Sequence, residues 1–167
     1  MKYFTLLFFF FLLLSCSDDS GNDDVNDDPI TPPDDTYTIW EGDNMTFTKD
    51  AETDPNLTEN QDAITASVAI TRGNDGGQIY NILQEDSANE DVSPVGTKWA
   101  IGEVSDIANL TFRNFRDAIG KPKNVVGKNL ILYIEAEEVY ISLKFLSWGQ
   151  GQSGQKGAFS YERSTEE

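Results

Sequence analysis

The stretch Val-Tyr-Ile-Ser-Leu-Lys-Phe at residues 139–145 decides the fold class of this chain. Apolar residues stand at every second position and alternate with more polar ones, which is the pattern of a β-strand with one buried face. Just upstream, residues 130–134 form a continuous apolar run rich in strand-forming side chains. Because only residues 135–138 separate the two stretches, they predict an antiparallel hairpin.

A second hairpin is predicted earlier in the chain. Residues 66–71 and 78–83 flank the sequence Asn-Asp-Gly-Gly at residues 74–77. These residue types favour the backbone conformations that a tight turn requires. Further strand candidates are residues 37–40, 45–48, 98–101 and 158–162.

One segment of the chain carries a helical pattern instead. In residues 110–119, the side chains of Phe112, Phe115 and Ile119 stand at helical spacing, and a glycine and a proline follow as stop signals. Together with the strand candidates, this predicts an all-β fold over residues 36–167. We expect a single antiparallel β-sandwich or jelly roll with one short helix.

The amino-terminal residues have the layout of a secretory signal peptide. After Lys2, residues 4–14 carry no charge, and this run is shorter than the roughly 17–25 residues that span a bilayer. Residues 1–15 are therefore predicted to be a signal peptide. The sequence Leu-Leu-Ser-Cys that ends at Cys16 resembles the lipobox of bacterial lipoproteins. That resemblance implies cleavage before Cys16 and a diacylglycerol anchor on its thiol.

An acidic segment separates the signal peptide from the β-rich region. Residues 16–35 contain eight aspartates and no lysine or arginine, so this segment is predicted to be a disordered tether. Ser17, Asp18 and Asp19 resemble the export signal of Bacteroidota lipoproteins. The resemblance implies a lipid-anchored outer-membrane protein displayed on the cell surface. The alternatives are a plain solubilising spacer and a lipoprotein that faces the periplasm.

The composition excludes several classes of function. The chain has no histidine and a single cysteine. This excludes a zinc site built from histidine and cysteine ligands and a catalytic triad that depends on histidine. A net charge of −17 argues against a nucleic-acid partner, because phosphate binding needs a basic face. Acidic residues cluster within 50–54 and 85–91 and suggest calcium, but residues 50–54 lack the glycine and closing glutamate of an EF-hand. We interpret them as solvated surface and expect neither a metal nor a cofactor.

The candidate ligand-binding residues are Tyr140, Lys144 and Trp148. Alternation along the strand places Trp148 on the face of Lys144, and a flexible Gly/Gln-rich loop at residues 149–157 follows it directly. An exposed indole can stack on sugar rings, so a concave face shared by the three side chains would be a glycan site. The alternative for any tryptophan is to fill the core.

Two further resemblances bear on function. Residues 40–165 resemble an uncharacterised extracellular domain of environmental bacteria, to which no activity is assigned. The fragments that carry this resemblance are residues 60–62, 70–73, 124–128, 144–148 and 157–165. The sequence Asp-Ser-Ala around Ser87 resembles a short O-glycosylation site of Bacteroidota, and the alternative is an ordinary polar loop.

Gln78 and Tyr80, together with Tyr140 and Lys144, resemble the groove residues of jelly-roll alginate lyases. In that family a histidine stands at the position of Tyr80. The sequence therefore leaves two functions open. The first is a non-catalytic module that binds an extracellular glycan or surface protein, or supports the envelope. The second is a lyase- or glycosidase-like enzyme that acts on polysaccharides with Tyr/Lys or carboxylate groups.

Overall fold

A computed structural model describes residues 29–31 and 37–167 and shows one all-β domain. The main sheet has the strand order β2-β9-β8-β7-β6, with β1 added beside β8, and a second sheet has the order β3-β4-β5. Neighbouring strands are antiparallel except for β1 and β8, which confirms the predicted fold class. The strands are β1 (Thr38–Trp40), β2 (Gly42–Lys49), β3 (Asp62–Ala63), β4 (Ala69–Arg72), β5 (Ile79–Asn81), β6 (Thr97–Ile101), β7 (Asn129–Ile134), β8 (Val139–Trp148) and β9 (Phe159–Thr165).

Both predicted hairpins are confirmed. Strands β7 and β8 are antiparallel, with Ile134 opposite Val139 next to the turn. Strand β4 pairs with β5 across the predicted Asn-Asp-Gly-Gly turn. The continuous apolar run of β7 has a simple cause. Leu130 and Leu132 enter the main hydrophobic cluster on one face of the sheet, whereas Ile131 enters a smaller cluster on the other face. Because β7 is covered on both sides, its sequence does not alternate.

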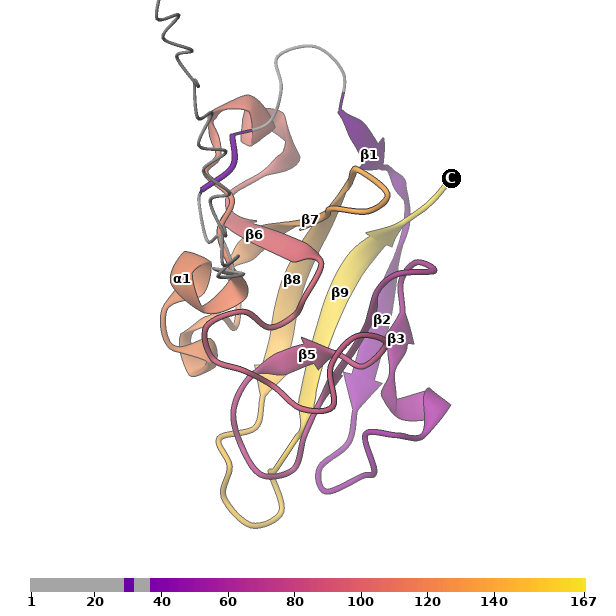
Figure 1. The fold of residues 1–167 in the computed structure, drawn as a ribbon, viewed down its shortest axis with the longest axis vertical. Coiled ribbons are helices and arrows are strands. Elements are labelled where there is room, and N and C mark those ends of the chain that lie inside the picture. Colours follow the sequence, from indigo (N-terminus) through magenta and orange to yellow (C-terminus); the bar gives the residue numbers. More distant parts are fainter. Residues whose placement is uncertain (1–28, 32–36) are drawn as a thin grey trace, which may run out of the picture.

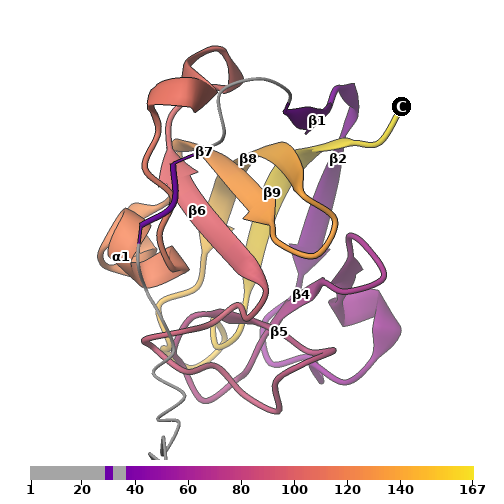
Figure 2. The ribbon, with the colours of Figure 1, turned by 45° about the horizontal axis from the view of Figure 1, so that its top comes forward.

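The two sheets form two layers around the main cluster. Figures 1 and 2 show β5 lying across the main sheet, where β8 and β9 run beneath it. Val68, Ile70 and Ile79 from the second sheet share the main cluster with Phe145 and Tyr161 of the main sheet. Burial of these side chains is the chief source of stability, at about 25 cal/mol per Å² of apolar surface removed from water.

A buried ion pair joins the same two layers. Arg163 on β9 donates from Nε to Oδ2 of Asp62 on β3 (2.7 Å) and from Nη2 to Oδ1 (2.9 Å). The hydroxyl of Tyr161 donates to Asp62 Oδ2 at 2.6 Å, and burial raises the pKa of Tyr161 well above its ordinary value. Asp62 and Arg163 are 4% and 5% exposed. The charges therefore compensate each other inside the protein.

The predicted helix over residues 110–119 is only half right. The helix α1 spans Phe115–Ile119, whereas Phe112 is extended and exchanges backbone hydrogen bonds with Ile30 at 3.1 and 3.0 Å. Phe112 and Phe115 belong to different hydrophobic clusters, so their helical spacing has no structural counterpart. Ile30, which was predicted to lie in a disordered tether, packs against the smaller cluster because it is apolar.

Short 3-10 helices connect the strands elsewhere. They are η1 (Thr58–Asn60), η2 (Val104–Asn109) and η3 (Pro122–Asn124). Within residues 29–31 and 37–167, none of the helices combines the length and the apolar character that crossing a bilayer requires.

Candidate functional site

The structure separates the three predicted ligand-binding residues of β8. Tyr140 is 4% exposed and packs among aromatic rings, with centroid distances of 4.5 Å to Tyr133, 5.4 Å to Phe112 and 5.8 Å to Tyr37. Lys144 lies on the same face of β8, four residues further along the strand, but it is exposed. It lines a hollow of about 290 Å³. Tyr140 therefore belongs to the core, and Lys144 does not share a site with it.

Trp148 lies on the opposite face of β8 from Lys144. The register between β8 and β9 shifts between Phe145 and Ser147, which is a β-bulge. A bulge inserts one residue and reverses the side-chain alternation beyond it. Trp148 is consequently half-buried against Phe145 and Phe159, at ring centroid distances of 5.6 and 6.2 Å. The prediction that Trp148 lies on the face of Lys144 is wrong for this reason. Because Tyr140 is buried as well, the three side chains do not form a shared exposed face.

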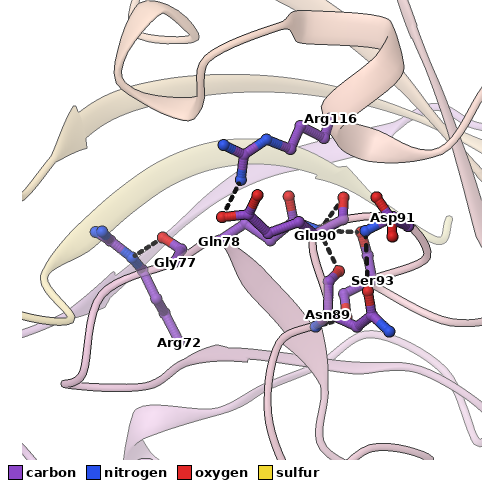
Figure 3. A network of polar contacts seen from close by, with 8 residues as sticks. All are labelled: Arg72, Gly77, Gln78, Asn89, Glu90, Asp91, Ser93 and Arg116. Carbon is purple, nitrogen blue, oxygen red and sulfur yellow. Dashed lines mark hydrogen bonds and ion pairs between the residues drawn. The ribbon is translucent and has the colours of Figure 1, made fainter.

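Gln78 is a structural residue rather than part of a catalytic groove. It is fully buried, and its Nε2 donates to the carbonyl oxygens of Asn89 and Ser93, both at 2.8 Å (Figure 3). No described residue donates to its Oε1. Gln78 and the buried Tyr80 belong to or border β5 of the second sheet. The lyase-like combination with Tyr140 and Lys144 is therefore not assembled.

A second hollow, of about 390 Å³, lies at the end of β8, and we call it the Trp148 pocket. Several segments that are distant in sequence meet there: the end of β4 and its turn, the loop before β6, α1, η3, and the loop after β8. The lining residues are Arg72, Gly76, Gly77, Glu90, Arg116, Lys121, Pro122, Lys123, Trp148, Gln150 and Gly151.

Arg72 forms the floor of the Trp148 pocket and is only 2% exposed. Its guanidinium carbon lies 4.1 Å from the centroid of the Trp148 ring, which is a cation–π contact. Nη1 donates to the carbonyl oxygens of Gly149 and Ala158, both at 2.9 Å, and Nε donates to Gly77 O at 3.3 Å. Burial lowers the pKa of Arg72 to about 10, so it is still positively charged at neutral pH.

Three more cations line the walls of the pocket. Arg116 reaches from α1 and forms an ion pair with Glu90 at 2.9 Å, as Figure 3 shows. Lys121 and Lys123 flank Pro122 in η3 and are exposed. No described carboxylate forms an ion pair with Arg72, Lys121 or Lys123. A protein of net charge −17 thus concentrates uncompensated positive charge in one hollow.

This geometry suits a negatively charged group better than a flat neutral ring. One face of the Trp148 indole is occupied by the Arg72 guanidinium, so that face cannot stack on a sugar. The cations instead offer N–H donors to an anion, and arginine pairs well with planar carboxylates and with sulfate or phosphate oxygens.

No known family model matches the chain, and no curated protein or solved structure is significantly similar to it. The assignment of the site therefore rests on its geometry alone. Cys16, Ser17, Asp18 and Asp19 lie outside the described residues.

The acidic segments form no cation cage in the part of the chain that the structure describes. No group of three or more potential ligand side chains gathers there. Asp50, Glu52 and Asp54 are exposed, as is Ser87 in the loop before β6. Glu85 differs from the expected solvated surface, because it accepts hydrogen bonds from backbone N–H groups and from a serine hydroxyl in its own loop.

Sequence reasoning identified Trp148 and its loop but missed the four cations of the pocket. Arg72, Arg116 and the pair Lys121 and Lys123 come from three separate segments that no local pattern connects. One usable signal was present. The sequence Lys-Pro-Lys at residues 121–123 is a local concentration of positive charge in a strongly acidic chain, and such reversals often mark binding surfaces.

The buried Tyr140 makes stability sensitive to alkaline pH. Burial raises the pKa of Tyr140 to about 12, above the ordinary tyrosine value of about 10. Between these values the native state keeps the phenol proton while the unfolded chain loses it, so the stabilisation present below pH 10 is lost as the pH rises toward 12. We expect Tyr140→Phe to flatten the decline of the urea midpoint between pH 9.5 and 11.5. Parallel curves for the variant and the wild type would contradict this assignment.

Proposed function

We propose that this chain is a cell-surface lipoprotein whose β domain is a non-catalytic module that binds an extracellular glycan in the Trp148 pocket. The lipid anchor on Cys16 and the export signal at residues 17–19 would display the domain outside the outer membrane. Two or more acyl chains make such anchoring stable where one chain is marginal. The acidic tether would hold the domain away from the membrane surface.

The observation that carries this proposal is the Trp148 pocket itself. It combines a half-buried indole, a fixed guanidinium and two exposed lysines in one hollow. Ligand sites are typically concave and combine an apolar wall with a few converging polar groups. The loop that follows Trp148 contributes Gln150 and Gly151 to the rim, so it can adapt to a bound chain.

The small number of carboxylates in the pocket favours a binding role over a hydrolytic one. Glycosidases of the common type use two carboxyl groups on either side of the scissile bond. Among the described residues, Glu90 is the one carboxylate that lines the Trp148 pocket, and it is engaged by Arg116 at 2.9 Å. A single paired carboxylate can orient a ligand but does not supply both an acid and a base.

Surface display is tested by changing the residues that follow the lipidated cysteine. We expect Asp18→Ala/Asp19→Ala to abolish labelling of intact cells by an antibody against the domain, while the protein stays in the membrane fraction. Cys16→Ala serves as the control for anchoring and is expected to release the protein from that fraction. Unchanged labelling of the double aspartate variant would contradict the export signal.

Glycan binding is tested by an array screen of a protein that begins at Ser17 and so retains every described residue. We expect selective binding to a subset of glycans, and we expect Lys121→Ala/Lys123→Ala to reduce it about tenfold through loss of two charged contacts. Lys128→Ala/Lys144→Ala is the matched control, because both lysines lie outside the Trp148 pocket. If the wild type binds no glycan on the array, the proposal fails and a protein partner or a structural role is favoured.

A further inference from the structure

We infer that the Trp148 pocket recognises an anionic saccharide unit, a carboxylate or sulfate group on a polysaccharide, with Arg72 as the anchor for the negative charge. This inference rests on the proposed function, since it names the chemical class of the ligand for the same site. It goes beyond a general glycan site because it predicts that the charge on the ligand, rather than ring stacking, decides affinity.

The charge of Arg72 is not balanced by an anion among the described residues. Its Nε and Nη1 donate to three backbone carbonyl oxygens, but among the described residues nothing accepts from Nη2 and no carboxylate pairs with the guanidinium. The other nearly inaccessible arginine, Arg163, has a bidentate partner in Asp62. A buried charge without a counter-ion is costly. A bound anion would offset that cost.

A purely structural role for Arg72 accounts for only part of the arrangement. Its bonds to Gly149 O and Ala158 O hold together the two ends of the loop after β8. That role does not require Lys121 and Lys123, which stand at the start of η3 and line the same hollow. Like charges repel, so three cations that line one hollow without an ion-pair partner among the described residues indicate a shared anionic partner.

Because the protein as a whole is acidic, any selectivity for anionic ligands must come from the Trp148 pocket itself. A net charge of −17 repels polyanions at long range, so a polyanion that binds must do so through a confined basic site. Exposed charges are screened within about 10 Å at 0.1 M salt. Salt therefore weakens both the repulsion by the whole protein and the attraction inside the pocket. For this reason, variants of the pocket lysines, rather than a change of salt, measure how much the pocket's cations contribute to affinity.

The test compares each charged polymer with its neutral counterpart. Binding to the protein that begins at Ser17 is measured by calorimetry for polygalacturonate against its methyl ester, and for dextran sulfate against dextran, in calcium-free buffer. We expect at least about tenfold tighter binding of one charged member over its neutral partner, and about tenfold weakening by Lys121→Ala/Lys123→Ala. The two pairs distinguish a carboxylate from a sulfate ligand. Lys128→Ala/Lys144→Ala is expected to bind within about twofold of the wild type.

A variant of Arg72 tests the anchor directly. Arg72→Lys keeps a positive charge but loses the planar fork, and we expect it to weaken binding of the charged polymer about threefold or more. Because Arg72 also bonds to the loop after β8, a urea midpoint measured beside the binding shows whether the variant is still folded. Should this variant unfold, the lysine variants decide the question.

The outcomes separate this inference from the proposed function. Binding to neutral glycans with no preference for charge would overturn the anionic ligand and leave the binding module standing. Charged-ligand binding that is lost in Lys128→Ala/Lys144→Ala and kept in Lys121→Ala/Lys123→Ala would place the site elsewhere and also overturn the inference. An absence of binding to every glycan, charged or neutral, would remove the proposed function itself.

Discussion

Asp62→Ala is expected to lower the free energy of unfolding by about 3–5 kcal/mol, because it leaves a buried guanidinium without a counter-ion. Arg163 is 5% exposed and donates two hydrogen bonds to Asp62, at 2.7 and 2.9 Å. The hydroxyl of Tyr161 loses its acceptor at the same time. Since β3 and β9 belong to different sheets, the substitution also weakens the connection between the two layers. Urea unfolding at pH 7 measures the loss.

Two controls distinguish an effect of burial from an effect of charge. Glu90→Ala breaks an ion pair of similar length, but Glu90 is 66% exposed, and we expect a loss within about 0.5 kcal/mol. The double substitution Asp62→Leu/Arg163→Met removes both charges and is expected to cost less than the two single substitutions together. If Asp62→Ala and Glu90→Ala destabilise the protein equally, the Asp62–Arg163 pair is not the buried connection described above.

Trp99→Ala is expected to lower the free energy of unfolding by about 3–5 kcal/mol, because it opens a cavity in the main cluster. Trp99 is fully buried, packs edge-on against Phe115 at 4.9 Å, and donates from Nε1 to Thr97 Oγ1 at 2.8 Å. Its backbone also exchanges hydrogen bonds with Arg113 at 2.7 and 3.0 Å. The side chain therefore packs α1 against the edge strand of the main sheet, while the backbone of Trp99 pairs with the segment before α1.

Trp40, which is half-buried, provides the matched control for Trp99. Trp40 only packs on the border of the main cluster, so Trp40→Ala removes less buried surface and is expected to cost roughly half as much. Thermal or urea unfolding of both variants makes the comparison. Equal losses for Trp40→Ala and Trp99→Ala would contradict the assignment of Trp99 to the centre of the core.

The strand pattern of the fold was readable from the sequence because local periodicity reports which faces are buried. The hairpin of residues 130–145 and the turn at residues 74–77 followed from alternation and turn chemistry. The helix prediction was wrong at Phe112, because spacing along the chain cannot reveal that Phe112 and Phe115 enter different clusters. That difference depends on the pairing of Phe112 with Ile30, which is a long-range contact.

The candidate site could be predicted only in part, for a related reason. Trp148 and its loop were visible in the sequence, but the β-bulge before Trp148 reversed its face. Bulges depend on the partner strand, so alternation along one strand does not show them. The cations of the pocket are brought together by tertiary structure. Arg72 in particular lies at the end of a strand and carries no local signal of a binding role.

The most direct test of the Trp148 pocket uses the indole N–H signals of the protein's three tryptophans. A short galacturonate oligosaccharide is titrated into ¹⁵N-labelled protein that begins at Ser17, and the signals of Trp40, Trp99 and Trp148 are followed by NMR. The pocket predicts a saturable shift of the Trp148 signal, while the buried Trp99 signal stays in place. A Trp148 signal that does not move while backbone signals around Lys144 shift would contradict the assignment of the ligand site.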